Sequence, residues 1–231
     1  MNIIAIDSSD QILSVALSTS EGAWYIEIDA GQRHSELLME SVDNLCKSAG
    51  LQPGDLNQVY CMKGPGSFTG LRIAFAAAKG LSLALGIPLS AVPTLDCMAY
   101  PLSIWPGIVL PAIDAKKSSF FAALYRGGER LSDFLDAQAE TLAGEFAKNR
   151  LSPEEKVVLT GPGANLLYPR LLSYIPKEQI ALDPQFRKGR ARELLEIAKS
   201  GIFDYTVENN SGPVYLRKSD AELKLGDKQE D

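Results

Sequence analysis

The chain has 231 residues, of which 45% are hydrophobic and 23% charged, a composition typical of a globular protein with one large domain or two small ones. Its formal net charge of −6 excludes the basic surface by which stand-alone nucleic-acid-binding proteins hold phosphates, so a role near RNA would need a basic partner. Its three cysteines, an odd and sparse set, argue against a disulfide framework and indicate a reducing, cytoplasmic environment.

The first residues form an apolar strand pattern and lack the basic region and cleavage site of a signal peptide. No apolar run reaches the roughly 18 residues of a membrane span without polar interruption. The longest one, residues 73–85, contains Lys79, Gly80 and Ser82 and is followed by Gly86 and Pro88. We therefore expect a helix of a soluble protein there and no membrane span.

The first half of the chain predicts the order β-β-β-α-β-α-β. Short apolar runs and a period of two predict the strands, whereas apolar residues at helical spacing predict the helices. Gly50 and Gly86 are suited to end the two helices. The predicted strands span residues 3–6, 12–17, 24–28, 59–62 and 89–92, and the predicted helices span residues 35–49 and 71–85.

The second half repeats this order more weakly. Its predicted strands span residues 108–113, 120–125, 134–137 and 157–159, and its predicted helices span residues 142–148, 166–173 and 190–200. Because each half opens with a strand, an acidic turn and a returning strand, the pattern indicates a duplicated α/β fold of the actin-like ATPase (ASKHA, ribonuclease H-like) type. We expect two subdomains, residues 1–99 and 100–225, each with a mixed sheet and helices, and a disordered charged tail at residues 226–231.

The most distinctive motif is Gly-Pro-Gly-Ser-Phe-Thr-Gly-Leu-Arg at residues 64–72. Backbone N–H groups at the start of the following helix could hold an anion. No Gly-Lys-Ser/Thr follows, so the motif is not a P-loop. A tight turn that lets the helix pack closely on the sheet is the alternative, and the spacing alone favours it.

Two aspartates, Asp7 and Asp114, occupy matching turns in the two halves. In a phosphate clamp such turns need glycines, which let the backbone approach the phosphates. Here Ser8 and Ser9 follow Asp7, and Ala115 with two lysines follows Asp114. The residues therefore favour turns capped by their own side chains over working phosphate clamps.

His34 is the only histidine, and a histidine-based metal site needs at least two or a cysteine cluster. A lone histidine at a helix start is more often a cap or a packing group. No nucleophile is marked by a motif either. We therefore predict neither a metal site nor a catalytic residue.

The predicted helix at 71–85 is apolar nearly all round. A helix with one face in water should show a polar stripe, but only Arg72, Lys79 and Ser82 are available for one. Its outer face is therefore expected to be covered, either by the neighbouring helix or by another subunit. The residues leave both possibilities open.

Taken together, several segments closely resemble the bacterial TsaB (YeaZ) family, over residues 1 to about 222. The motif at 64–72 is the most specific of them. The others are individually weak but occur in the right order: Ile-Ile-Ala-Ile-Asp-Ser-Ser at 3–9, His34, Ile113-Asp114-Ala115 and Pro213-Val214-Tyr215-Leu216-Arg217.

The resemblance implies an actin-like fold and a noncatalytic relative of TsaD. TsaD is the subunit that transfers a threonylcarbamoyl group to an adenosine beside the tRNA anticodon. TsaB proteins bind TsaD, and TsaE joins them as an ATPase. This chain would thus be a scaffold subunit that binds no cofactor tightly, leaves the use of ATP to the complex and meets tRNA only indirectly.

By the same resemblance, the two helices at 35–49 and 71–85 would form the contact with TsaD, or a homodimer through the same region. Glutamate at Ala77 or Ala78 is then expected to disrupt pairing and leave the monomer folded. The implied interface residues are His34, Leu38, Val42, Leu45, Leu71, Arg72, Phe75, Ala78, Lys79 and Ser82.

The catalytic relatives hold a metal with two histidines, and Thr94 and Met98 stand at those places here. The chain also departs from the TsaB pattern at Lys116-Lys117-Ser118-Ser119, where the family has an arginine followed by Gly-Glu-Val-Tyr. We expect only degenerate nucleotide loops: Asp7, Ser8, Gly64, Gly66, Ser67, Asp114, Gly161 and Gly163. The alternatives are a homodimeric regulatory protein and a weak ATPase or peptidase of the same superfamily.

Overall fold

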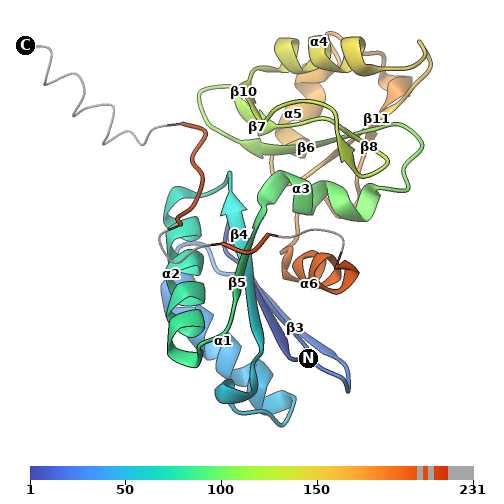
Figure 1. Ribbon diagram of the computed structural model, residues 1–231. Coiled ribbons are helices and arrows are strands. Elements are labelled where there is room, and N and C mark those ends of the chain that lie inside the picture. Colours follow the sequence, from blue (N-terminus) through green and yellow to red (C-terminus); the bar gives the residue numbers. More distant parts are fainter. Residues whose placement is uncertain (202–204, 208–210, 218–231) are drawn as a thin grey trace, which may run out of the picture.

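A computed structural model describes residues 1–201, 205–207 and 211–217. Figure 1 shows two α/β subdomains, with the N-terminal sheet in the lower one and the C-terminal sheet in the upper one. Within these described residues, three short 3-10 helices lie in the connections, at Pro53–Asp55, Tyr100–Leu102 and Lys177–Gln179.

The N-terminal sheet has the strand order β3-β2-β1-β4-β5. The first three strands pair antiparallel, and β1, β4 and β5 pair parallel. Every residue of β1 and β2 is buried, which explains their continuous apolar runs. The strands are β1 (Ile3–Asp7), β2 (Ile12–Ser18), β3 (Ala23–Asp29), β4 (Gln58–Gly64) and β5 (Leu89–Pro93).

Helices cover both faces of this sheet. The side chains of a strand alternate between the two faces, and here both sets are apolar and buried. Ile4 and Ile6 of β1 pack in one core cluster with α1 (His34–Ser48) and α2 (Phe68–Leu85). Ile3 and Ala5 pack in another cluster with α6 (Ala191–Ser200) on the opposite face. The side chain of Ser67 caps α2, and Gly86 ends it in a left-handed conformation.

The C-terminal sheet repeats the order, as β10-β7-β6-β11-β12. The antiparallel pairs again come first and the parallel pairs follow. The predicted duplication and the actin-like fold class are confirmed. The elements are β6 (Ile108–Asp114), β7 (Phe120–Ala122), β10 (Leu135–Ala137), α4 (Ala139–Asn149), β11 (Val157–Thr160), α5 (Ala164–Leu171) and β12 (Ile180–Leu182).

The structure differs from the sequence predictions in several connections. The helix α3 (Thr94–Ala99) was not predicted, because six residues are too few to show a helical period. The strand expected at 120–125 is split into β7 and β8 (Tyr125–Arg126), and β8 pairs with β9 (Glu129–Arg130). The strand β12 was also missed.

The predicted subdomain boundary is wrong for the end of the chain. Helix α6 packs its apolar face on β1 and β2, in the N-terminal subdomain. Residues 205–207 then pair with the edge of β5, through a bridge between Ser90 and Thr206. The expected tail at 226–231 lies outside the described residues.

Two glycines of α2 provide a stability prediction. A Cβ at Gly70 would overlap the carbonyl oxygen of Ser8, whereas a Cβ at Gly80 would meet nothing within 4 Å. We expect Gly70→Ala to lower the free energy of unfolding by about 3 kcal/mol, and Gly80→Ala to raise it by up to about 1 kcal/mol, as for a helical glycine. Urea unfolding followed by circular dichroism measures both changes, and equal effects would contradict the packing.

The three cysteines are free and buried, which gives a prediction of thiol reactivity. Burial, with the nearby Asp7 carboxylate as a smaller cause, raises the pKa of Cys61 to about 12. Burial also raises the pKa of Cys46 and Cys97. Because the thiolate is the reactive form, we expect a chromogenic disulfide reagent at pH 8 to modify no thiol before unfolding and all three afterwards. Rapid modification of the folded chain would contradict this.

Candidate functional site

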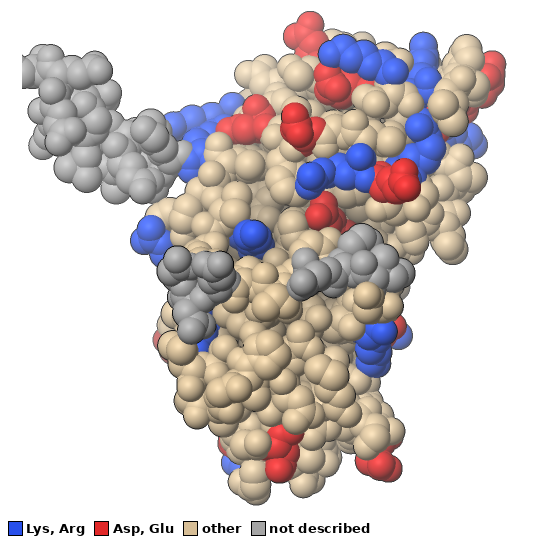
Figure 2. All heavy atoms as spheres, in the orientation of Figure 1, with Lys and Arg blue, Asp and Glu red and all other residues tan. Residues whose placement is uncertain are grey.

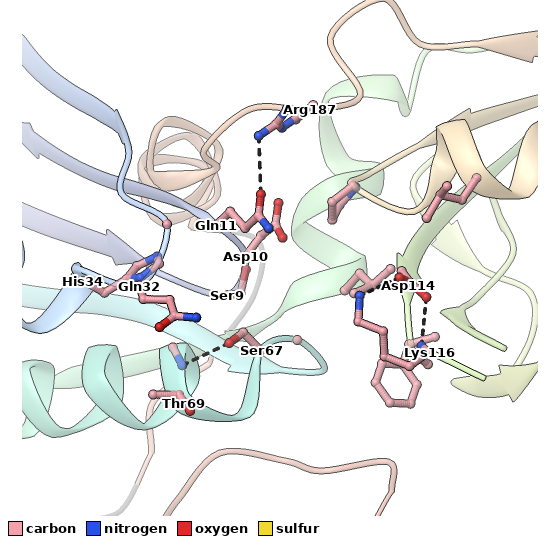
Figure 3. Close-up of a pocket in the computed structure, with 18 of the residues that line it drawn as sticks. Ser9, Asp10, Gln11, Gln32, His34, Ser67, Thr69, Asp114, Lys116 and Arg187 are labelled. Carbon is pink, nitrogen blue, oxygen red and sulfur yellow. Dashed lines mark hydrogen bonds and ion pairs between the residues drawn. The ribbon is translucent and has the colours of Figure 1, made fainter. Parts of the chain in front are cut away.

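A cleft with a cavity of about 960 Å³ lies between the two subdomains. Five segments far apart in the sequence line it: the β1–β2 turn, the segment before α1, the start of α2, the β6–β7 hairpin and the start of α5. The loop before α6 also lines the cavity, through Phe186 and Arg187. Figure 3 shows Gln32, Ser67 and Thr69 on one wall, with Asp114 and Lys116 across from them.

The motif at 64–72 forms the N-terminal wall by docking onto the β1–β2 turn. The Ser67 N–H donates to the Ser9 carbonyl oxygen (2.7 Å), and the Ser8 hydroxyl donates to the Gly70 carbonyl oxygen (2.8 Å). A Cβ at Gly66 would lie 2.7 Å from the Ser9 carbonyl oxygen, so the backbones touch there. These contacts account for the glycines as a packed turn, which the spacing favoured.

Asp7 is buried beneath this wall and does not line the cavity. Its carboxylate accepts hydrogen bonds from the Ser9 N–H (2.9 Å), the Ser9 hydroxyl (2.7 Å) and the Arg190 N–H (2.9 Å). Burial raises the pKa of Asp7, and these hydrogen bonds oppose the rise only in part. The carboxylate therefore caps its own turn, as the sequence indicated.

Asp114 does line the cavity, but its carboxylate is paired with Lys116. The Lys116 N–H and ammonium group each lie 2.8 Å from one of its oxygens. Partial burial raises the pKa of Asp114, but these bonds outweigh that effect and leave the pKa below its usual value. Lys116, Lys117 and Ser118 all adopt positive φ angles of 52–65°, which favour glycine, so this hairpin is strained.

The other predicted loop residues divide between the cavity and the packing of the elements. Gly66 and Ser67 line the cavity with Asp114, whereas Asp7, Ser8, Gly64, Gly161 and Gly163 lie outside its lining. A Cβ at Gly161 or Gly163 would approach the backbone of residues 112–114 to under 3 Å, so these two glycines let α5 sit close to β6. The sequence missed the lining residues Asp10, Gln11, Asn165 and Arg187, which no motif marks.

His34 is the first residue of α1 and lines the cavity with a buried imidazole. It does not cap the helix, because Arg33 occupies the cap position. Its Nε2 atom is buried and has no hydrogen-bond partner. In the described part of the chain, no three His, Cys, Asp or Glu side chains are grouped to hold a metal ion.

Most side chains of the predicted partner interface are buried within the chain's own core, and the interface itself stays a prediction. Helical stripes of apolar residues identify the face toward the chain's own sheet, and the structure buries them there. Of the ten predicted residues, Arg72 is exposed and Lys79 is half-buried. Ala78 is fully buried, so glutamate there would disrupt the core rather than test a contact. The eight buried residues are His34, Leu38, Val42, Leu45, Leu71, Phe75, Ala78 and Ser82.

The exposed side of α2 carries a different set of residues, which we call the α2 outer face: Thr69, Arg72, Ala76, Gly80, Leu83 and Ala84. Leu83 is 65% exposed, and Met39 of the neighbouring α1 is 48% exposed. Figure 2 shows that the surface over α2 and β5 has few charged groups, whereas charges gather over the C-terminal subdomain. The residues of the α2 outer face recur at intervals of three and four, and this spacing could have revealed the exposed stripe from the sequence.

Helix α2 begins three residues before the predicted start and has 18 residues. By length and composition alone, it is the one helix of the described chain that could cross a membrane. Leu71, Ala74 and Phe75 of its inner face pack in the cores on the N-terminal sheet. That packing accounts for the apolar residues of its inner face.

Comparisons with known proteins agree with this architecture. The family described as TsaD, tRNA N6-adenosine threonylcarbamoyltransferase, matches residues 28–187. The TsaB proteins of Escherichia coli and Bacillus subtilis, named as tRNA threonylcarbamoyladenosine biosynthesis proteins, are 30% and 27% identical. These alignments cover 99% and 97% of this chain and 100% and 97% of the relatives.

Solved structures give the same result. YeaZ from Pseudomonas aeruginosa is 26% identical with a TM-score of 0.73, and the match covers 93% of this chain and 99% of that one. A Bacteroides thetaiotaomicron protein with an actin-like ATPase fold, 10% identical with a TM-score of 0.51 over 84% of this chain and 95% of that one, shares the fold alone. The chain therefore belongs to the TsaB (YeaZ) family of tRNA threonylcarbamoyladenosine biosynthesis proteins.

Proposed function

We propose that this chain is a noncatalytic scaffold subunit, which binds a TsaD transferase through the α2 outer face and recruits TsaE to the same complex. The observation that carries the proposal is the exposed Leu83 among small residues on an apolar helix. TsaD would carry out the transfer to tRNA, in the cytoplasm, and this chain would meet tRNA only through the complex.

The α2 outer face is suited to a helix from a partner. Ala76, Gly80 and Leu83 follow one another at intervals of four and three residues, so they lie on one side of the helix. The small residues allow a second helix to approach closely, and Leu83 provides an apolar side chain to bury. Met39 of α1 would extend the contact.

The state of the cleft supports the absence of catalysis by this chain. The Asp7 carboxylate already accepts three hydrogen bonds, and the Asp114 carboxylate is held by Lys116. Neither is free to hold a magnesium–nucleotide complex without breaking these contacts. We therefore assign the use of ATP to the complex.

Self-association is the second candidate, because an apolar helix face can also pair with a copy of itself around a two-fold axis. The α2 outer face favours this form equally well in the absence of the transferase. The two assemblies would then compete for the same residues.

Omission of one component tests the scaffold role. TsaD and TsaE of the same organism, supplied with tRNA and the activated threonylcarbamoyl donor, should modify tRNA only when this chain is added. The formation of threonylcarbamoyladenosine is measured by mass spectrometry of digested tRNA. Full activity without this chain, or ATP hydrolysis by this chain alone, would overturn the proposal.

A further inference from the structure

Residues 211–217, which we call the C-terminal strap, contact both subdomains within four residues. Val214 is attached to the N-terminal subdomain, and Arg217 is attached to the C-terminal subdomain. Three residues of extended chain span at most about 11 Å, so these contacts limit the separation of the two subdomains at this side of the cleft.

The first attachment is to β4 and α2. The Val214 N–H donates to the Lys63 carbonyl oxygen (2.7 Å). Gly64 has a φ angle of 107°, and a Cβ there would overlap the Val214 carbonyl oxygen, so the strap and β4 touch backbone to backbone. The Tyr215 ring packs 4.7 Å from the Phe68 ring, and its hydroxyl accepts from the Arg72 Nε (3.0 Å).

The second attachment is to the C-terminal sheet and its strained hairpin. Arg217 donates from Nε and Nη2 to the two carboxylate oxygens of Asp136 in β10, at 2.8 and 2.7 Å. Its Nη1 donates to the Ala115 carbonyl oxygen at the base of the β6–β7 hairpin (2.9 Å). The Ser119 hydroxyl at the other end of that hairpin donates to the same Asp136.

These two attachments flank the cleft. Gly66 and Ser67 line the cavity just after the first attachment, and Ala115 and Lys116 line it beside the second. The strap therefore ties the two walls together. The Arg217 and Asp136 side chains are 31% and 23% exposed, so solvent and salt reach this ion pair.

The floor of the cleft is held differently. Arg190 is 1% exposed, its N–H donates to Asp7 of β1 (2.9 Å), and its Nη2 donates to Thr160 of β11 (3.2 Å). This buried residue thus joins the two sheets where salt cannot screen it. A buried joint on one side and an exposed ion pair on the other allow rotation about the buried side.

We propose that the C-terminal strap is a latch that holds the inter-subdomain cleft closed, with Arg217 and Asp136 as its clasp and the Arg190 contacts as its pivot. When the clasp opens, the subdomains rotate apart about the floor and the cavity widens. Arg217 then also leaves the Ala115 carbonyl oxygen at the base of the strained hairpin, whereas Ser119 keeps its hydrogen bond to Asp136 within the C-terminal subdomain.

Distances between spin labels on the two subdomains test this latch. The exposed positions Asn44 on α1 and Ala147 on α4, which lie outside the α2 outer face and the clasp, can be labelled selectively as cysteines, because the native cysteines are buried. We expect the full-length chain to give one narrow distance distribution, and Arg217→Ala to give a broader one shifted to longer distances. The exchanged pair Arg217→Asp with Asp136→Arg should narrow the distribution again in part, because it restores the ion pair but not the hydrogen bond to Ala115.

A matched control removes a similar ion pair elsewhere. Lys148 pairs with Glu145 within α4 at 2.6 Å, so Lys148→Ala removes the same charge without touching the strap and should leave the distribution narrow. High salt should broaden the distribution of the unmutated clasp and leave that of Arg217→Ala unchanged. Identical distributions for Arg217→Ala and the parent chain, or equal broadening by Lys148→Ala, would overturn the latch.

Discussion

Leu83→Glu is expected to weaken binding of the TsaD transferase at least about 100-fold, since an unpaired carboxylate would be buried in the centre of an apolar contact. The free chain should fold normally, because Leu83 is 65% exposed and loses no contact of its own core. The change in its free energy of unfolding should stay within about 0.5 kcal/mol. Isothermal titration calorimetry gives the affinity, and urea unfolding gives the stability.

Two control variants separate a contact from a core defect. Leu151→Glu makes the same change at a side chain that is 80% exposed in the C-terminal subdomain, and it should leave the affinity unchanged. Ala78→Glu buries the same charge inside the chain's own core and should unfold it. The interface assignment fails if Leu83→Glu binds as tightly as Leu151→Glu.

Arg190→Met is expected to destabilise the chain by about 3 kcal/mol, the lower end of the range for breaking a buried charged contact. The change removes a guanidinium group that is 1% exposed and bonded to Thr160 at 3.2 Å. Glu193, whose carboxylate lies 3.8 Å from Arg190, keeps its pair with Lys188 at 2.5 Å, which moderates the loss. Urea unfolding measures the effect.

Arg192 provides the matched control for this prediction. It lies two residues further along, is exposed, and places its guanidinium group 5.4 Å from the centre of the Tyr25 ring. Arg192→Met should therefore change the free energy of unfolding by no more than about 0.5 kcal/mol. If both substitutions have the same small effect, Arg190 does not join the two sheets as described.

The fold could be predicted where local patterns were strong. The continuous apolar runs of β1 and β2 predicted these strands correctly because both faces of each strand are buried, and the apolar stripes predicted α1 and α2 because one face of each helix is buried. The short strand β12 and the six-residue α3 gave no such period. The return of α6 to the first sheet depends on contacts between residues about 180 positions apart, which no local pattern records.

The candidate site was predicted less well, for a related reason. The resemblance implied the two helices as an interface, but apolar side chains such as Leu38 and Phe75 face the chain's own core, whereas Leu83 is exposed. The capped turn at Asp7 followed correctly from the serines beside it, because an Asx-type turn is local. The attachment of Val214 beside Gly64 joins residues 150 positions apart and could be seen only in the structure.

Size-exclusion chromatography with light scattering, on this chain alone and mixed with the TsaD transferase of the same organism, tests the proposed function most directly. We expect a stoichiometric complex of the two proteins, and we expect Leu83→Glu to abolish it. If the two proteins elute separately at every ratio, with and without ATP and TsaE, the scaffold function is contradicted.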